Sequence, residues 1–478
     1  MSMNNELSRV WLDRFKQHAQ SLEEAERAAF EQQVSQVDWP QVAVLVREHV
    51  FQPPDAEENF DLSGLQPADF VPLVSTLSEK ARWEAASQTG EEMLRRGEVG
   101  VVIVAGGQGS RLGFDGPKGT YPIGAISGFG LFYFHARKIV ALSRRYDYAV
   151  PLLIMTSPEN DEATRIYFEE HGFFGLDPDQ VRFFRQGQMP AVDRHTGEPL
   201  FAGPERLALS PDGHGGCLYA MARVDPTDGV SALDWAEARG VKTLFYYQVD
   251  NPMVHVADPP FLGLHAQGQA EVSFKVVAKQ APHEKVGVVC AGADGRKLVI
   301  EYSDLPEELA VARNLLGQLS YRAGSIAVHI FQADFLRRLA SGETRLPFHK
   351  ALKKVHFWDF SRAEQITPAE PNAVKFEAFI FDTLPMAERS VIVEADRTAE
   401  FEPLKNAEGP DSPDTVRAAM SLAAAKVLID AGFNIELDDA GRPVQVIELD
   451  PVLADQPEAI RQKFPRGVGT GPFILIRE

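Results

Sequence analysis

Residues 99–119 read VGVVIVAGGQGSRLGFDGPKG, and the fold is decided by this stretch. Its first part, 99–105, is an unbroken apolar run that ends at glycine, which is typical of a strand buried on both faces. Glycines follow at positions 106, 107, 109, 113, 116 and 119, so the backbone can approach a ligand without interference from Cβ atoms. Free N–H groups in such a loop can bind an anion, and Arg111 and Lys118 add positive charge. The stretch therefore predicts recognition of phosphate.

Three phosphate-binding motifs are compatible with a strand followed by a glycine-rich loop. A dinucleotide fingerprint needs G-x-G-x-x-G, but Gly107, Gly109 and Gly113 are spaced one residue too widely. A P-loop needs G-x-x-x-x-G-K-[ST], whereas the nearby Lys118 follows a proline. The third motif, a nucleotidyltransferase loop of the form G-G-x-G-[ST]-R-L-G followed by P-K-G, fits residues 106–119 at every position. A tight turn that uses its glycines only for packing is the alternative, but it would need neither cation.

Composition limits the class of protein. With 478 residues the chain is long enough for two or three domains, and 44% hydrophobic and 24% charged residues are ordinary for a globular protein. No apolar run approaches the length of a transmembrane helix, and the first residues lack the pattern of a signal peptide. Two cysteines, Cys217 and Cys290, without a C-x-x-C pair, predict a cytoplasmic location and argue against a disulfide framework.

The formal net charge of −20 argues against nucleic acid as a partner, because no basic face is evident. A phosphate ligand must therefore be held by a few local cations and a divalent metal, which fits a small nucleotide better than a polymer. The composition leaves the oligomeric state open.

Apolar runs of strand length alternate with helical patterns along most of the chain. The predicted strands are 99–105, 150–156, 181–185, 243–249, 272–277, 286–289, 298–302, 325–331 and 374–381. This alternation predicts an α/β fold: a Rossmann-like domain with a mostly parallel, mixed sheet covered by helices. The predicted organisation is a helical N-terminal region (1–97), a catalytic domain (98–395) and a smaller α+β C-terminal domain (396–478).

Several predicted strands end at residues that could carry chemistry, and ligands of such sheets lie beyond the carboxyl ends of the strands. Asp250 follows the strand 243–249 and could hold Mg²⁺, although Asp-Asn-Pro is also a turn sequence. Gln186 could read a base edge or could equally be a buried amide bonded to backbone. His214 lies between two glycines, which favours a ligand contact over a structural role. Lys405 precedes a helix capped by Ser412 and is either a surface lysine or a phosphate contact.

These stretches together resemble the eukaryotic-type UDP-N-acetylhexosamine pyrophosphorylases and the related UDP-glucose and UDP-sugar pyrophosphorylases. The resemblance runs from about 98 to 420. It rests on VAGGQGSRLG (104–113), PKG (117–119), HGFFGLDPDQVRFFRQGQMPAV (171–192), PDGHGG (211–216), DNPMVHVADP (250–259), EKVGVVC (284–290), FEAFIFD (376–382) and EPLKNAEGPDSP (402–413).

The resemblance implies a UTP:sugar-1-phosphate uridylyltransferase whose substrates are UTP and a sugar 1-phosphate and whose cofactor is Mg²⁺. It implies catalytic roles for Arg111, Lys118 and Lys405, and a metal at Asp250. The implied UTP-binding residues are Val104, Ala105, Gly106, Gly107, Lys118, Gln186, Gly213, Asp250 and Lys405. The implied sugar-binding residues are His214, Gly287, Glu301, Ser325, Phe379 and Phe381.

Two positions depart from the acetylhexosamine pattern, because His214 and Ser325 both stand where asparagine is usual. Both positions would face the sugar, so N-acetylglucosamine and glucose remain alternatives. A dinucleotide-binding oxidoreductase is a further alternative, but no acidic residue ends a second strand about 20 residues after the loop. A silent UDP-sugar-binding protein is another, against which Arg111, Lys118 and Asp250 argue.

Overall fold

The computed structural model describes residues 3–51, 64–342, 345–465, 467–469 and 471–478. It divides into two compact units. The first unit comprises the described parts of Met1–Leu65, Gln186–Ala220 and Leu339–Asp382, and the second comprises Gln66–Arg185, Met221–Arg338 and Thr383–Glu478. The predicted domain boundaries at 97 and 395 stay a prediction.

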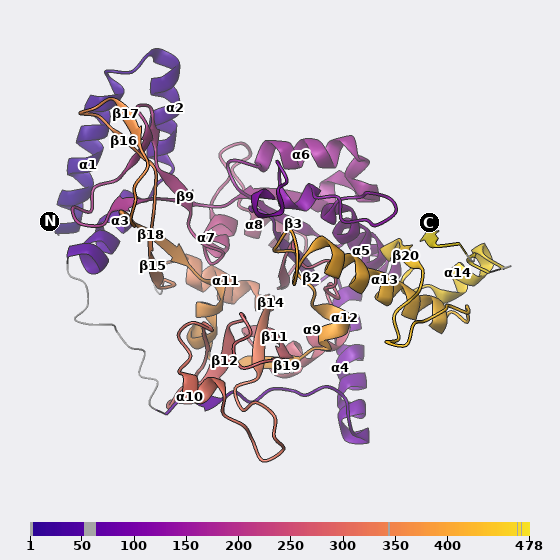
Figure 1. The fold of residues 1–478 in the computed structure, drawn as a ribbon. Helices are drawn as coiled ribbons and strands as arrows, with labels where there is room; N and C mark the ends of the chain where they lie inside the picture. Colours follow the sequence, from indigo (N-terminus) through magenta and orange to yellow (C-terminus); the bar gives the residue numbers. More distant parts are fainter. Residues whose placement is uncertain (1–2, 52–63, 343–344, 466, 470) are drawn as a thin grey trace. The chain divides into compact units, whose positions relative to one another are not determined.

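The second unit is built on a ten-stranded sheet (Figure 1). The strand order is β1-β12-β14-β10-β2-β3-β4; β11 pairs with β14 and with β19, and β13 pairs with β12. The bounds are β1 (Gln66–Pro67), β2 (Val99–Val104), β3 (Leu152–Thr156), β4 (Val181–Arg185), β10 (Thr243–Gln248), β11 (Val272–Ala278), β12 (Val288–Ala291), β13 (Lys297–Ile300), β14 (Ala323–Gln332) and β19 (Ser390–Glu394).

Parallel pairing joins β10, β2, β3 and β4, whereas β14 runs antiparallel to β10, β11 and β12. The strand β2 is buried from Val99 to Ile103, as its apolar sequence predicts. The sheet is thus mixed, with a parallel half that carries the glycine loop. The predicted α/β class with a mixed sheet is confirmed.

Helices of the second unit complete its core. They are α4 (Leu77–Arg95), α5 (Leu131–Tyr146), α6 (Asp161–Glu170), α8 (Ala232–Glu237), α9 (Pro259–Gln267), α10 (Glu307–Ala310), α12 (Arg397–Glu400), α13 (Pro413–Asp430) and α14 (Pro457–Lys463). Helices α4 and α9 cross so closely that a Cβ atom on Gly263 would lie 1.7 Å from the carbonyl oxygen of Ala86. Two further strands, β20 (Val446–Leu449) and β21 (Phe473–Ile476), form a parallel pair.

The first unit combines three helices with small sheets. The helices α1 (Met3–Ala19), α2 (Glu24–Ser35) and α3 (Trp39–Val46) are drawn in indigo in Figure 1. They share a core that includes Trp11, Phe30 and Trp39. The strands are β5 (Gln188–Pro190), β6 (Val192–Asp193), β7 (Phe201–Gly203), β8 (Arg206–Leu207), β9 (Leu209–Pro211), β15 (Phe348–Lys353), β16 (Phe357–Asp359), β17 (Glu364–Ile366) and β18 (Ala373–Ala378). Helices α7 (Gly216–Ala222) and α11 (Ala333–Ala340) begin in one unit and end in the other.

The strand predicted over 374–381 needs a correction. It ends at Ala378 and belongs to a three-stranded sheet with β15 and β6, not to the large sheet. The next residues form a 3₁₀ turn, Ile380–Met386, that contains Phe381. The apolar character of 379–381 reflects an aromatic cluster rather than continued strand pairing.

Candidate functional site

The glycine loop after β2 folds back on itself. The N–H of Gly109 donates to the carbonyl of Gly116 at 2.9 Å, and the N–H of Lys118 donates to the carbonyl of Gly107 at 3.0 Å. Gly113 ends a short 3₁₀ turn in the left-handed region, with φ of +67°. Within the described residues, the N–H groups of Gly106 and Gly107 have no acceptor. The predicted loop therefore presents unpaired donors of the kind that bind an anion.

A buried asparagine that sequence reasoning missed fixes the start of this loop. Asn160 precedes α6, and its Nδ2 atom donates to the carbonyl of Ala105 at 2.9 Å. Its Oδ1 atom accepts from the N–H of Ser157 at 2.7 Å. Asn160 therefore joins the ends of two neighbouring parallel strands, β2 and β3. The carbonyl of Val104 is similarly engaged, since it accepts from the N–H of Val249 at 3.0 Å.

Lys118 and Asp250 lie at the carboxyl ends of β2 and β10 and form an ion pair. The Lys118 Nζ atom is 3.7 Å from Oδ2 of Asp250 and 3.4 Å from the carbonyl oxygen of Leu404. Their side chains are 19% and 13% exposed, so both charges are largely screened from water yet still reachable. The two predicted residues are thus brought together, and the contact is loose enough to be exchanged for a phosphate.

The segment that carries Lys405 is tied to the end of β10. The N–H of Leu404 donates to the carbonyl of Asp250 at 2.7 Å. The buried Asn251 side chain donates to the carbonyl of Glu400 at 2.8 Å and accepts from the N–H of Glu402 at 3.3 Å. Lys405 itself is half-buried, with Nζ 5.8 Å from the centre of the Phe401 ring. Lys405 therefore directly follows the residue whose carbonyl contacts Lys118.

Arg111 stands apart from this ion pair. It lies on the short turn Ser110–Leu112, its side chain is exposed, and no hydrogen bond or ion pair joins it to another described residue. The predicted catalytic role of Arg111 stays a prediction, because the exposed guanidinium can be reached by a phosphate.

Gln186 and Gly213, two of the UTP-binding residues that the resemblance implies, meet within the first unit. Gln186 is 7% exposed, and its Nε2 atom donates to the carbonyl of Gly213 at 3.0 Å. Gly213 has φ of +88°, and a Cβ atom there would lie 2.3 Å from the carbonyl oxygen of Ala378. The loop 211–216 is therefore pressed against the end of β18, where only glycine fits.

His214 lies in an aromatic cluster at the end of β18. Its Nδ1 atom accepts a hydrogen bond from the N–H of Ile380 at 3.1 Å, and its ring stacks on Phe379 with centroids 5.4 Å apart. The Phe381 centroid is 5.7 Å away. Burial, helped by the charge of nearby His349, lowers the pKa of His214 to about 4. The ring is therefore neutral at physiological pH and carries its proton on Nε2.

His349 is a member of this cluster that sequence reasoning missed. Its ring stacks on Phe379 with centroids 4.6 Å apart, and its Nε2 atom is 2.8 Å from Oδ2 of Asp382. An isolated histidine on a strand gives no sequence signal; only the register of β15 against β18, which pairs His349 with Glu377, places it here.

The remaining predicted sugar residues meet in the second unit. The N–H of Ser325 donates to the carbonyl of Gly287 at 2.8 Å. A Cβ atom on Gly287 would lie 3.7 Å from Oε1 of Glu301. Gly287, Glu301 and Ser325 therefore form one group on β14 and the neighbouring chain, while Phe379 and Phe381 belong to the first unit.

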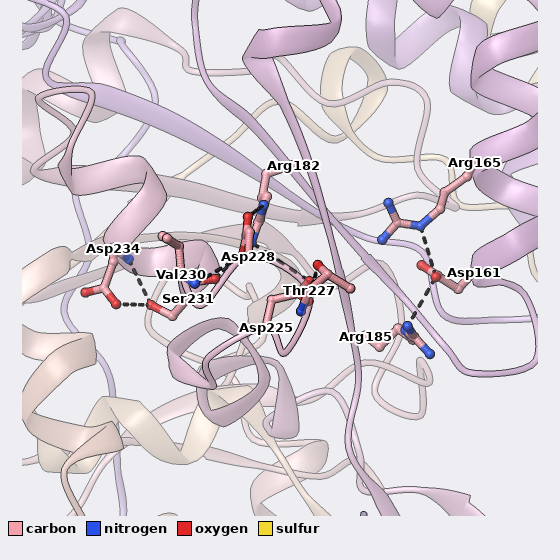
Figure 2. Close-up of polar contacts among 10 residues, drawn as sticks. All are labelled: Asp161, Arg165, Arg182, Arg185, Asp225, Thr227, Asp228, Val230, Ser231 and Asp234. Carbon is pink, nitrogen blue, oxygen red and sulfur yellow. Dashed lines mark hydrogen bonds and ion pairs between the residues drawn. The ribbon is translucent and has the colours of Figure 1, made fainter. Parts of the chain in front are cut away.

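Ion pairs secure the edge strand β4 (Figure 2). Asp161 accepts from the Thr156 hydroxyl at 2.6 Å and pairs with Arg165 at 3.0 Å and Arg185 at 3.4 Å. Arg182 binds the Asp228 carboxylate through both terminal nitrogens and donates to the carbonyl of Val230 at 2.9 Å. These contacts fix the last residue of β4, which immediately precedes Gln186.

The described residues include no group of three or more His, Cys, Asp or Glu side chains that could hold a metal ion. Mg²⁺ commonly binds through one or two carboxylates together with substrate phosphates and water. Asp250, a single carboxylate that lies 3.7 Å from Lys118 of the glycine loop, fits that mode. In the described part of the chain, no helix combines the length and apolar character needed to cross a membrane.

Comparison with known proteins gives consistent matches. A sequence model of the UTP–glucose-1-phosphate uridylyltransferase family matches residues 49–452. A UDP-N-acetylglucosamine pyrophosphorylase from Saccharomyces cerevisiae is 37% identical over 386 residues, which cover 79% of this chain and 78% of the yeast protein. UDP-N-acetylhexosamine pyrophosphorylase-like protein 1 from Xenopus tropicalis is 36% identical over 434 residues, covering 86% of this chain and 82% of the relative.

A solved structure is also similar over the whole chain. The uridine diphosphate N-acetylglucosamine pyrophosphorylase from Trypanosoma brucei, solved in complex with an inhibitor, superposes with a TM-score of 0.83 at 25% identity. The similarity covers 100% of this chain and 99% of that one.

Proposed function

This chain belongs to the UTP–glucose-1-phosphate uridylyltransferase family, and from that premise we propose that it transfers a uridylyl group from UTP to a sugar 1-phosphate, releasing diphosphate. The observation that carries the proposal is the ion pair between Lys118, in the glycine loop after β2, and Asp250, just after β10. The Lys118 Nζ atom lies 3.7 Å from Oδ2 of Asp250. Neither the oxidoreductase nor the silent binder gains support from the comparisons, which name pyrophosphorylases.

The chemistry asks little of the protein beyond positioning and charge neutralisation. The sugar phosphate oxygen attacks the α-phosphorus and the diphosphate leaves; because the nucleophile is already an anion, no general base is needed. Two polyanions must be brought together, which costs electrostatic energy. The donors of Gly106 and Gly107 with Lys118, Lys405 and Arg111 would provide that neutralisation. Arg111 can bind phosphate in a bidentate manner, whereas each lysine acts as a point charge.

Asp250 is the residue that would hold Mg²⁺, in company with the phosphates of UTP. The bound ion would supply further positive charge to the phosphate groups. Lys118, released from Asp250 by a phosphate, would then bind the nucleotide. Turnover in the presence of excess EDTA equal to that with Mg²⁺ would contradict the metal requirement.

N-acetylglucosamine 1-phosphate is the sugar phosphate we favour. Relatives at 34–37% identity are named for UDP-N-acetylglucosamine or UDP-N-acetylhexosamine. Glucose 1-phosphate is the second candidate because His214 resembles the UDP-glucose enzymes.

Diphosphate release with UTP and Mg²⁺ tests the proposal, with glucose, galactose, N-acetylglucosamine and N-acetylgalactosamine 1-phosphates compared. Preference for N-acetylglucosamine 1-phosphate is expected. Preference for glucose 1-phosphate would mean that His214 and Ser325 determine a different sugar. No release with any of them would overturn the proposed reaction.

For the compartment we infer the cytoplasm, since both cysteines, Cys217 and Cys290, are buried and unpaired in the described structure. Fractionation of cells that produce the protein, followed by detection of the chain, would test this location.

A further inference from the structure

A buried lysine far from the glycine loop in sequence connects three parts of the second unit. Lys275, on β11, is 1% exposed. Its Nζ atom is 2.5 Å from Oε2 of Glu400 and 2.9 Å from Oδ2 of Asp258. Asp258 precedes α9 and Glu400 ends α12, so one ammonium group joins a strand, a helix start and the chain that leads to Lys405.

The charges in this network are retained despite burial. Burial by itself would lower the pKa of Lys275, but the neighbouring Asp258 and Glu400 carboxylates raise it above its ordinary value. The Phe261 ring lies 5.3 Å from Nζ and adds a cation–π contact. The Lys275 ammonium therefore remains protonated and holds both carboxylates in fixed positions.

Glu400 also fixes the backbone of residues 400–405, the segment that ends at Lys405. Its side chain is held by Lys275, while its carbonyl accepts from Asn251, the neighbour of Asp250. Two residues later Glu402 returns a hydrogen bond to Asn251, and Leu404 donates to the carbonyl of Asp250. The position of the Leu404 carbonyl, and hence of its 3.4 Å contact with Lys118, depends on this anchor.

We propose that Lys275 is a positioning residue of the phosphate-binding machinery: acting through Glu400, it fixes segment 400–405 against the end of β10. Lys275 touches no substrate; it sets where Lys405 and the Leu404 carbonyl stand. The proposal rests on the proposed function for its kinetic consequences, but its structural consequence, the fixation of segment 400–405, does not.

Replacing a whole buried ion pair by apolar residues is often neutral, whereas removing one partner alone is strongly destabilising. The network at Lys275 also has a positional consequence, because its partner Glu400 lies in the segment that leads to Lys405. A misplacement of about 1 Å at a reacting centre can cost on the order of 10²-fold in rate. A positioning role therefore predicts a large kinetic effect in the folded Lys275 variants, in addition to a loss of stability of the kind that Arg137→Met also shows.

The test uses the full-length chain with substitutions Lys275→Met, Lys275→Arg and Glu400→Gln. Arg137→Met is the matched control, because Arg137 is equally part of a buried pair, with Asp450 at 2.9 Å, that makes no contact with segment 400–405. The readouts are the KM for UTP, kcat, the unfolding midpoint, and hydrogen–deuterium exchange of the amides in 400–405.

In Lys275→Met we expect the KM for UTP to rise about 10-fold or more and the amides of 400–405 to exchange faster. Both effects should be smaller in Glu400→Gln. In Lys275→Arg the KM and the exchange should return to the wild-type values. Arg137→Met should lower the unfolding midpoint without changing the KM or that exchange. Unchanged exchange and KM in a folded Lys275→Met would overturn the proposal, as would equal effects in Arg137→Met. If wild-type chain released no diphosphate, the proposed function would fail, while the exchange measurement would still decide whether Lys275 fixes the segment.

Discussion

The Nδ1 atom of His214 lies 3.1 Å from the backbone nitrogen of Ile380 and accepts its hydrogen bond. This contact leaves the proton on Nε2 and binds the loop 211–216 to the turn that holds Phe381. The histidine is therefore a structural acceptor, and its predicted contact with the sugar would fall to Nε2.

Replacing His214 tests this hydrogen bond. His214→Leu removes the ring nitrogen that accepts from the Ile380 N–H and should lower the free energy of unfolding by about 1–3 kcal/mol. His214→Asn keeps a side-chain acceptor and should lose less. Urea unfolding measures the free energy of unfolding of both variants. Equal values for His214→Leu and His214→Asn would show that the hydrogen bond to Ile380 contributes nothing to stability.

Lys118 and Asp250 should be needed for catalysis but not for folding. Lys118→Ala and Asp250→Ala each remove one charge at the ends of β2 and β10, and by analogy with loss of one transition-state donor, kcat/KM should fall roughly 10²–10³-fold. The control is Lys80→Ala, because Lys80 is an exposed residue of α4 whose ion-pair partner among the described residues is Glu84. Steady-state kinetics and circular dichroism give the comparison; near-wild-type activity in Lys118→Ala would remove it from the mechanism.

The sequence is informative where function depends on a local pattern. The glycine loop, Asp250 and Lys405 each belong to a motif of consecutive residues that is recognisable in the sequence. The structure brings Lys118, Asp250 and the segment before Lys405 together. Parallel strands share one carboxyl edge, which is why residues about 130 positions apart could be grouped from strand ends alone.

Other features depend on contacts that no local pattern encodes. Asn160 acts through a carbonyl on the neighbouring strand, and Lys275 through carboxylates from two distant helices. The first unit is assembled from three separate stretches, so a reading in chain order cannot see that 339–382 packs with the N-terminal helices. The sequence pattern of 374–381 predicts one strand because the aromatic cluster at 379–381 has the same composition as a strand end.

Two glycines of the loop should respond to alanine in opposite ways. A Cβ atom on Gly107 meets nothing within 4 Å, so Gly107→Ala should fold normally, yet it would place a methyl group where a phosphate must approach. On Gly119 a Cβ atom would lie 2.1 Å from the Phe132 ring, so Gly119→Ala should destabilise the fold. We expect a raised KM for UTP in Gly107→Ala at unchanged unfolding midpoint, and a lowered midpoint in Gly119→Ala. An unchanged KM in Gly107→Ala would mean that the loop does not approach the nucleotide there.

Asn160→Ala should loosen the glycine loop. The substitution leaves the Ala105 carbonyl and the Ser157 N–H without their partner, at a cost of about 1–3 kcal/mol. Because Ala105 begins the loop, kcat/KM for UTP should fall as well, by on the order of 10-fold. Asn160→Asp, which keeps only the acceptor, serves as the comparison: it should retain the Ser157 contact and lose the one to Ala105. Wild-type kinetics in Asn160→Ala would show that the loop holds its shape without this anchor.

Acid should destabilise the second unit through buried histidines. Burial lowers the pKa of His135 and of His265 from 6.5 to about 3. The unfolded chain therefore binds more protons than the folded chain between these values, so the stability that the two neutral rings confer is complete above pH 6.5 and is lost as the pH falls towards 3. Between pH 7 and pH 5 each ring should account for about 2 kcal/mol of lost stability.

His265→Gln isolates one of these contributions. The neutral His265 ring bonds to Ser273 and Gln332, each at 2.8 Å, and glutamine cannot take up a proton in this range. The free energy of unfolding is measured with urea at pH 7 and at pH 5 for both proteins. Its decrease from pH 7 to pH 5 should be smaller by about 2 kcal/mol in His265→Gln than in the wild type. This difference does not depend on how much stability the substitution itself costs at pH 7. Equal drops in the two proteins would show that the pKa of His265 is the same in the folded and unfolded chains, which would contradict the prediction.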